Sequence, residues 1–586
     1  MLRAPGYVRE RWRRAPAAQS LAQSLALSLA LLATAAQAQT GATPAVVPTP
    51  GELARQLEPQ RPAEAPPDIR PLPPEMPRPE NDQLSLDVQR YTVDASAPES
   101  LKAALPRLTA GFVGKGRSYE DLVNATSAVT RFLQSELGYY LGYAYLPAQT
   151  PEDGSVRIAI LEGRLDRAVL KDADKLPVRR EVLQAYIDRL KPGSILKVQD
   201  VERVVFLLND LRGVNVRAEV KPGTLPGTAI LEFTPTGDPR FDLKADGDMN
   251  GSKYIGRVRL GATGYWNSPL GRGDSVSASA LVSGGGGLKF ALIGYNTPIG
   301  SNGLKAGVSV STLKYALDKT DFPLDLHGSG NTANIFVLYP WVRSRNLNLF
   351  SLTALDEKRY DDTISAIDTK KTIRDGVLGI TGDFRDSLLG GAVNTFELNY
   401  SHGQLSFAKQ KPSGSDDDDN FGKFSYAYSR LQSIVEGRLL GYFNLRGQLA
   451  MNNLDSTEQF RAGGPDGLRG YGPGDGTGDS GAIVSAELRW LPPESWFGRF
   501  ARELVLGVFV DGARITLRKD ASRVPRDPSY VNTATLYDAG VSLVWARPAA
   551  YALRMSIASR LGSDNTAVAA ADESRARLYL QGTWFF

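Results

Sequence analysis

Arg469 lies in a glycine-rich stretch that reads DGLRGYGPGDGTGDSGAIVSAELRW over residues 466–490. Its guanidinium is always charged and presents a planar fork of donors that suits a carboxylate or a phosphate. Glycines allow the tight turns and the close backbone approach that such binding would use. The stretch could therefore be a phosphate-binding loop, a protease signature or a loop with another role.

Neither of the two catalytic patterns in this stretch is complete. Residues 470–474, GYGPG, have dinucleotide-like glycines, but they open no helix and lack the spacing of the third glycine. Residues 478–481, GDSG, resemble the surroundings of a serine-protease nucleophile, but the triad needs a histidine base. The chain has two histidines, His327 and His402, and both fall in expected loops. We therefore predict that the chain is not an enzyme.

Composition argues against several other kinds of site. The absence of cysteine excludes a cysteine nucleophile and, with two histidines, leaves almost no Cys/His metal site. With 68 basic and 64 acidic residues the net charge is only +4, which gives no case for nucleic acid. The run Asp416–Asp419 is expected to be a solvated loop tip, with a calcium site as the alternative. We predict no cofactor and no metal centre.

Residues 1–38 have the pattern of a signal peptide. Several arginines precede the apolar run Leu21–Leu32, and Ala36-Gln37-Ala38 has the small-x-small form of a cleavage site. No later segment offers about 18 consecutive apolar residues, so no transmembrane helix is expected. The mature chain is therefore predicted to be either a soluble exported protein or an outer-membrane β-barrel.

A proline-rich linker and two small modules follow. Residues 39–83 are predicted to be a linker, in which Pro50–Leu57 could form a short helix or be plain linker. Residues 84–164 and 165–238 each predict a small α+β module, because strand-like alternation flanks segments with helical spacing. The predicted helices are Ser118–Leu137, Val178–Leu190 and Val198–Leu211, and the predicted strands are Leu84–Asp94, Tyr143–Leu146, Val156–Leu161, Leu165–Lys171, Val214–Val220 and Thr228–Phe233.

Residues 239–586 predict an all-β barrel. Ser275–Ser283 alternates small apolar residues with serines, and Ala576–Phe586 alternates leucines and aromatics with polar residues. Segments of about ten residues with one apolar and one polar face are typical of membrane barrels, in which every backbone group must be paired. At roughly 20–24 residues per strand and connection, the length allows about 14–17 strands.

The two modules resemble POTRA domains. The matching text is LPAQ and VRIAILEGRL in the first module, and LKPGSILKVQDVERVVFLLNDLRGVNVRAEVKPGTLPGTAILEF in the second. POTRA domains are periplasmic docking modules. The resemblance implies that they hold an unfolded polypeptide by adding it to a sheet edge.

The barrel region resembles the two-partner secretion transporters, the TpsB proteins of ShlB/FhaC/HecB type in the Omp85 superfamily. The markers are DMNGS from Asp248, PLGRGD from Pro269 and GYNTPIG at Gly294–Gly300. The resemblance implies two POTRA domains followed by a 16-stranded transmembrane barrel in the cell outer membrane. It also places Arg272-Gly273-Asp274 in a turn between strands, which argues against reading this tripeptide as a cell-adhesion motif.

The resemblance also assigns a role to Arg469. Leu468-Arg469-Gly470-Tyr471 matches the VRGY/F motif of the long sixth extracellular loop, which folds back into the barrel lumen. The family's partner is the aspartate of an inner-wall FxDxG motif, here Phe509-Val510-Asp511-Gly512, with Ala513 in place of the second glycine. The resemblance therefore predicts an Arg469–Asp511 pair. It further implies that the terminal Phe586 is read by the outer-membrane assembly machinery.

The resulting prediction is a monomeric outer-membrane transporter with its N-terminal domains in the periplasm. It would export an unfolded partner protein, which docks on the POTRA domains and passes through the barrel lumen. Pro50–Leu57 lies where the family often has a lumen-plugging helix. One alternative is an Omp85-type factor for barrel assembly or insertion, and another is a diffusion porin, although porins lack periplasmic modules.

Overall fold

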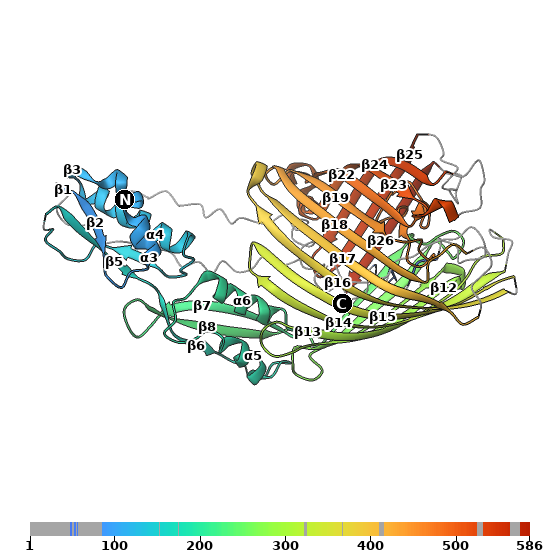
Figure 1. Ribbon diagram of the computed structural model, residues 1–586, viewed down its shortest axis with the longest axis horizontal. Coiled ribbons are helices and arrows are strands. Elements are labelled where there is room, and N and C mark those ends of the chain that lie inside the picture. Colours follow the sequence, from blue (N-terminus) through green and yellow to red (C-terminus); the bar gives the residue numbers. More distant parts are fainter. Residues whose placement is uncertain are drawn as a thin grey trace.

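The computed structural model describes residues 47–49, 52, 53, 56, 85–151, 153–173, 175–320, 325–365, 367–409, 415–523, 531–562 and 575–586. The predicted signal peptide and most of the linker lie outside these residues. In the part of the chain that is described, no helix combines the length and the apolar character needed to cross a membrane. Two small modules lie beside a large barrel (Figure 1).

The first module is a three-stranded sheet covered by two helices. The helix α4 (Tyr119–Ser135) begins with a capping box, in which Ser118 and Asp121 each accept a hydrogen bond from the other's backbone N–H. Its apolar face, which includes Phe132 and Leu133, is buried in the module's core. The other elements are α3 (Glu99–Thr109), the sheet strands β2 (Arg90–Val93), β5 (Ser155–Leu161) and β4 (Tyr143–Tyr145), and the separate pair β1 (Leu86–Val88) and β3 (Gly114–Arg117).

The second module repeats the plan. Its sheet has the order β6 (Arg164–Leu170), β8 (Thr228–Gly237), β7 (Val214–Pro222), and its helices are α5 (Arg180–Ile187) and α6 (Val198–Asn209). The buried apolar faces of both helices pack on this sheet. The backbone N–H of Tyr140 donates to Leu196 O at 2.7 Å, so direct backbone contacts join the two modules.

Sixteen antiparallel strands close into a barrel, because the last strand pairs with the first. The number agrees with the predicted fold and lies within the range expected from length. The strands are β9 (Phe241–Asp248), β10 (Arg259–Asn267), β11 (Ser275–Ser283), β12 (Leu288–Pro298), β13 (Lys305–Ala316), β14 (Leu326–Arg343), β15 (Leu347–Ile364), β16 (Ile367–Asp386), β17 (Ala392–Phe407), β18 (Asn420–Val435), β19 (Leu439–Ala450), β22 (Ser480–Trp490), β23 (Leu504–Thr516), β24 (Thr533–Arg547), β25 (Tyr551–Leu561) and β26 (Ala576–Phe585).

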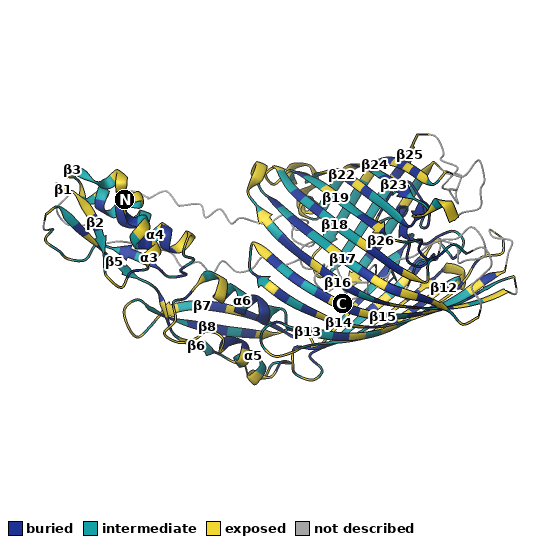
Figure 2. Ribbon diagram, in the orientation of Figure 1, coloured by how far each residue is buried: buried dark blue, intermediate teal, exposed yellow. Residues whose placement is uncertain are grey.

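The barrel strands alternate between buried and exposed residues, as Figure 2 shows. In β26, Leu578 and Trp584 are exposed, whereas Tyr579 between them is buried. Charged residues such as Lys358 and Asp511 are buried on the inner face, and large apolar residues lie on the outer face. This is the pattern of a barrel whose outer wall meets lipid.

The chain enters the barrel from the second module at β9, which fixes the two ends of the barrel. The strand β9 runs away from the modules and β10 returns toward them. The connection from β10 to β11, residues 268–274, and each second connection after it therefore lie at the module end. At the opposite end, the connection between β19 and β22 is long and contains the short pair β20 (Phe460–Arg461) and β21 (Thr477–Gly478). Residues 451–479, which we call the inner loop, fold back into the barrel and contact its inner wall.

The predicted secondary structure differs from the observed one in several places. His327 and His402, which the sequence predicts in loops, lie in the strands β14 and β17. Leu84–Asp94 was expected to be one strand, but it divides into β1 and β2, which belong to different sheets. The helix α3 was not located, because Pro106 interrupts its sequence pattern while its Leu101 and Leu105 are nevertheless buried.

Candidate functional site: the loop inside the barrel

Arg469 of the inner loop binds two wall carboxylates at once. Its Nε donates to Asp511 Oδ2 and its Nη2 to Asp511 Oδ1, both at 2.9 Å, which is bidentate geometry. Its Nη1 donates to Glu487 Oε2 at 3.0 Å. The guanidinium carbon also lies 3.2 Å from the centre of the Phe509 ring. We call these contacts the arginine anchor; Glu487 was not singled out from the sequence.

The residues next to Arg469 in the sequence also contact the inner wall of the barrel. The backbone N–H of Gly470 donates to Asp538 Oδ2 at 2.8 Å, and a Cβ on Gly470 would lie 2.7 Å from that aspartate's Cβ. Glycine is therefore required by space at this position. Leu468 is fully buried among apolar residues, and the carbonyl of Tyr471 accepts a hydrogen bond from Tyr579 at 2.7 Å.

The motif on β23 divides between the two faces of the strand. Phe509, Asp511 and Ala513 lie on the inner face and are buried. Gly512 lies on the outer face, where a Cβ would meet the ring of Tyr537 at 3.1 Å, so the interpretation of Gly512 as an inner-wall residue is wrong. Ala513, which replaces the family's second glycine, packs in the same apolar cluster as Leu468.

A second set of ion pairs holds the first half of the inner loop, with the signs reversed. Glu458 of the loop accepts from Lys358 Nζ at 2.9 Å and from Lys423 Nζ at 2.8 Å. Asp455 accepts from Lys371 Nζ at 2.9 Å with each of its oxygens. These side chains are almost fully buried. We call them the lysine anchor.

The lysine anchor was missed from the sequence. Its lysines come from β15, β16 and β18, so they are far apart in the chain and no single motif contains them. A usable signal did exist: a lysine at an inward position of an otherwise alternating strand requires a buried partner.

The acidic run at Asp416–Asp419 is not a solvated loop tip. Arg518 pairs with Asp416 at 2.7 Å and with Asp417 at 3.1 Å, and all three side chains are largely buried. Arg523 pairs with Asp418 at 2.8 Å. Among the described residues, no group of three or more His, Cys, Asp or Glu side chains is arranged to hold a metal ion.

Part of the N-terminal segment also lies in the lumen. The backbone N–H of Leu53 donates to Thr49 O at 3.1 Å, which is helical spacing, and the other residues of Pro50–Leu57 that the structure describes are Glu52 and Gln56. Leu53 is fully buried against apolar inner-wall residues of β11 to β14. Glu52 accepts from Arg461 of the inner loop at 3.0 Å, so this segment contacts both the wall and the loop.

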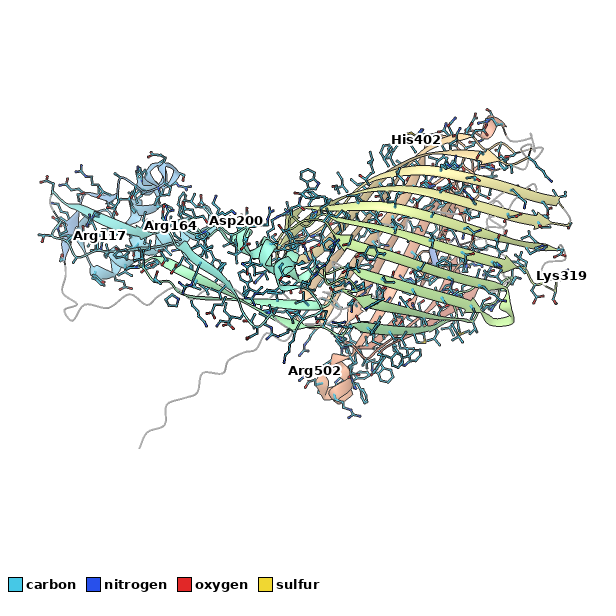
Figure 3. All side chains as sticks on the ribbon, turned by 90° about the horizontal axis from the view of Figure 1, so that it is seen from below. Arg117, Arg164, Asp200, Lys319, His402 and Arg502 are labelled. Carbon is cyan, nitrogen blue, oxygen red and sulfur yellow. The ribbon has the colours of Figure 1, made fainter. Side chains whose placement is uncertain are left out.

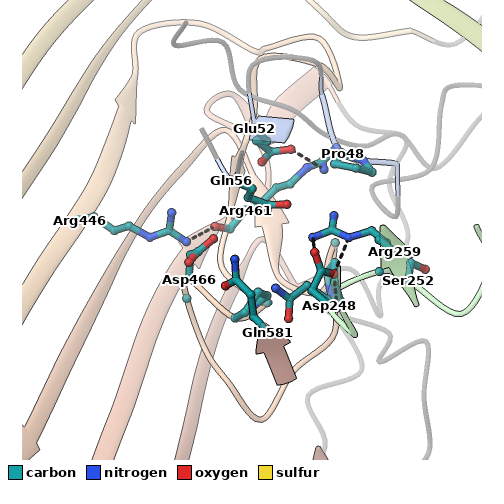
Figure 4. Close-up of a pocket in the computed structure, with 18 of the residues that line it drawn as sticks. Pro48, Glu52, Gln56, Asp248, Ser252, Arg259, Arg446, Arg461, Asp466 and Gln581 are labelled. Carbon is teal, nitrogen blue, oxygen red and sulfur yellow. Dashed lines mark hydrogen bonds and ion pairs between the residues drawn. The ribbon is translucent and has the colours of Figure 1, made fainter. Parts of the chain in front are cut away.

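A cavity of about 410 Å³ remains beside these contacts. Figure 4 shows Glu52, Arg461 and Asp466 around it, together with Arg259, which pairs with Asp248 at 2.8 Å. The lining is rich in charged and polar side chains from the N-terminal segment, the inner loop and the wall. The described part of the lumen is therefore narrowed by two segments of the chain itself.

The second module is attached to the module end of the barrel. Arg343 of β14 donates to both carboxylate oxygens of Asp210, at 2.7 and 3.0 Å. Burial by itself would raise the pKa of Asp210, but Arg343 and Lys305 hold this pKa below its ordinary value. Arg272-Gly273-Asp274 lies at the same contact: Arg212 N–H donates to Gly273 O at 3.1 Å. Asp274 is fully buried.

Phe586 ends the chain next to the first strand. Its N–H donates to Leu243 O at 2.8 Å, and its side chain is 76% exposed on the outer face. An exposed terminal aromatic ring is available to another molecule. Its role as an assembly signal stays a prediction.

A closed 16-stranded barrel with a lipid-facing outer wall, two small α+β modules at one end and a loop anchored in the lumen together define a membrane-spanning β-barrel protein with N-terminal modules. A model of the haemolysin secretion/activation proteins ShlB/FhaC/HecB matches residues 227–523, and one of the ShlB-type POTRA domain matches residues 86–163. The chain belongs to the ShlB/FhaC/HecB family of outer-membrane secretion transporters.

Individual relatives agree with this family. The heme/hemopexin transporter protein HuxB of Haemophilus influenzae is 25% identical over 484 residues, which cover 81% of this chain and 84% of HuxB. The outer membrane transporter CdiB of Dickeya dadantii is 22% identical over 70% of this chain and 72% of CdiB. The structure of CdiB from Escherichia coli has the same fold, with a TM-score of 0.66 at 19% identity over 87% of this chain and 93% of that one.

Proposed function

We propose that this chain exports one partner polypeptide from the periplasm to the cell surface, through the barrel lumen. The proposal rests on a lumen narrowed by two internal segments, each held to the wall by ion pairs and an apolar cluster rather than by strand pairing within the barrel sheet. A segment held in this way can move aside without unfolding the barrel. The family's secretion/activation role supports the same direction of transport.

The partner enters, in this proposal, by adding a strand to a POTRA sheet. The three-stranded sheets end at β2 and β4 in the first module and at β6 and β7 in the second, so each has edges that can pair with an extended chain. An unfolded partner suits this mode because main-chain hydrogen bonds do not require one sequence. We also propose that residues 84–164 and 165–238 are the two POTRA domains and that residues 239–586 are the barrel domain. The transporter is proposed to act as a monomer.

The two anchors position the inner loop along the path of the partner. Withdrawal of Arg469 would leave Asp511 as a buried carboxylate without its cation, which costs about 3–5 kcal/mol. Glu487 would keep Arg489, whose Nε lies 3.2 Å from Glu487 Oε1. The lysine anchor adds a second barrier at the other half of the loop. We propose that the arginine anchor sets the secretion-competent geometry of the loop, beyond pinning it to the wall.

Relatives in the family bear names that point to different cargo, such as heme/hemopexin transport for HuxB. The partner of this chain is therefore proposed only as a polypeptide that is unfolded in transit. Its folding outside the cell would supply the energy for export.

The direct test is deletion of this protein in its own cell, followed by comparison of the proteins in the periplasm with those on the cell surface. We expect one polypeptide to accumulate in or be degraded from the periplasm and to vanish from the surface, and the wild-type chain to restore it. A general loss of outer-membrane barrels would contradict the proposal and favour the assembly factor. Loss of small-solute uptake with unchanged secretion would favour the porin.

A further inference from the structure

The connection between β22 and β23, residues 491–503, differs from the other connections at the periplasmic end. It is the longest of them and forms the short helices α7 (Glu494–Phe497) and η5 (Gly498–Arg502). Figure 3 shows Arg502 on this segment, which projects sideways from the barrel at the end nearest the modules. We call residues 491–503 the aromatic turn.

The aromatic turn exposes large apolar side chains. Trp496 is 74% exposed, and Phe497 and Phe500 are each 38% exposed. These rings pack edge-on against aromatic residues of the barrel strands. The centres of the Trp496 and Trp490 rings are 5.6 Å apart, and those of Phe500 and Trp545 are 6.0 Å apart.

Those barrel rings belong to the outer, lipid-facing surface. Trp490 follows Leu488 at two-residue spacing, and Leu488 is exposed on the outer face of β22. Trp545 lies on the outer face of β24, two strands away, and its ring contacts Tyr551 of β25 at a centre distance of 5.5 Å. The aromatic turn therefore continues the apolar outer face of the barrel.

The charged side chains of the turn are arranged around these rings. Glu503 accepts from the Trp545 indole and the Tyr551 hydroxyl, each at 2.9 Å, and so fixes the turn to the strands. Arg499 and Arg502 are exposed; Arg499 lies 5.0 Å from the centre of the Phe500 ring, and Arg502 pairs with Glu494. Exposed rings beside arginines match the membrane interface, where aromatic rings and cationic groups meet lipid headgroups.

We propose that the aromatic turn is an interfacial anchor, which lies in the phospholipid headgroup region of the periplasmic leaflet with Trp496 directed into the acyl boundary. Exposure of these aromatic rings to water would be energetically unfavourable, whereas contact with lipid beside the outer wall would bury their apolar surface. A soluble polypeptide is the other class of occupant, and it would find this patch only if the patch faced the periplasm rather than the bilayer. The anchor would fix the barrel's depth and tilt beneath the attached POTRA modules.

The chain has no cysteine, so single labels can be placed without background. The full-length variant Trp496→Cys would carry a nitroxide spin label in bilayers of phosphatidylethanolamine and phosphatidylglycerol. Power saturation then compares collisions with oxygen, which concentrates in the bilayer, and with a water-soluble nickel chelate. Val508→Cys, on the outer face of β23, gives the membrane reference, and Leu225→Cys, in the exposed β7–β8 turn, gives the water reference.

We expect the oxygen-to-nickel ratio at position 496 to exceed that at position 225 at least fivefold and to approach that at position 508. A ratio within twofold of that at position 225 would overturn the proposal and assign the patch to a soluble partner. Each variant is first checked for a folded barrel by its heat-dependent mobility in gels. Since the label reports lipid contact alone, this result is independent of whether secretion proceeds as proposed.

Discussion

The inner loop is held at two places that use opposite charge arrangements. At the arginine anchor a loop cation meets wall carboxylates, whereas at the lysine anchor loop carboxylates meet wall cations. The first site concentrates a bidentate pair, a second carboxylate and a ring on one guanidinium. The second site spreads its contacts over three point charges. The arginine anchor therefore depends on the exact placement of one guanidinium, whereas the lysine anchor depends on the combined charge of three ammonium groups.

The substitution Arg469→Ala removes the arginine anchor and is expected to have the largest effect. We expect secretion to fall at least tenfold with the barrel still inserted, because the fully buried Asp511 loses its cation at a cost of about 3–5 kcal/mol, while Glu487 keeps Arg489. Secretion of the partner and heat-dependent mobility of the barrel are the measurements. Arg374→Ala is the matched control, since Arg374 pairs with Glu357 on the outer face. Wild-type secretion by Arg469→Ala would remove the functional role of the anchor.

Arg469→Lys tests whether geometry matters beyond charge. Lysine keeps the positive charge but cannot make the two-pronged contact with Asp511 or stack flat on Phe509. We expect secretion to fall several-fold, with a loss of about 1.5–3 kcal/mol for each charge-assisted hydrogen bond that is not replaced. If the Arg469→Lys variant secreted as well as the wild-type chain, positive charge alone would be sufficient at this position. The proposed difference between the arginine anchor and the lysine anchor would then be wrong.

Glu458→Gln tests the lysine anchor. The amide keeps the size of the side chain but removes the charge shared by Lys358 and Lys423, while Lys358 retains Asp375 at 2.8 Å. Because the other ion pairs of the lysine anchor still hold the loop, we expect only about a two- to fivefold loss of secretion, smaller than for Arg469→Ala. Glu357→Gln, on the outer face next to Lys358, is the control. A loss greater than that of Arg469→Ala would reverse the ranking of the two anchors.

The arginine–carboxylate pair Arg343–Asp210, which joins the second module to the module end of the barrel, should resist acid. Since the folded state lowers the pKa of Asp210, the pair's contribution is fully present above the ordinary value of about 3.9 and is lost only as the pH falls through the lowered value. Spin labels at Leu225→Cys and Ile299→Cys would report the module–barrel distance. We expect no change from pH 7.5 to 4.5; broadening within that range would contradict the assignment.

The sequence predicted the barrel and the arginine anchor for different reasons. Alternation in segments such as Ser275–Ser283 is a local pattern, so each strand could be predicted from its own residues. The Arg469–Asp511 contact came from a family motif rather than from spacing. Inward-facing lysines indicate that a buried partner is needed, but the partners in the lysine anchor and in the Glu52–Arg461 contact could not be predicted, because these residues come together only after the barrel has closed. Gly512 was misplaced because a motif does not state which side of a strand each residue faces.

If the arginine anchor holds the inner loop inside the barrel, the position of the loop tip must depend on Arg469. Asp466 borders the lumen cavity, and as the single cysteine Asp466→Cys it can be labelled on intact cells with a bulky maleimide that cannot enter the narrowed lumen. Our account predicts slow labelling when Arg469 is present and labelling at least tenfold faster when Arg469→Ala is added. Equal rates in the two backgrounds would show that the ion pair does not hold the loop inside the barrel, and would contradict the account.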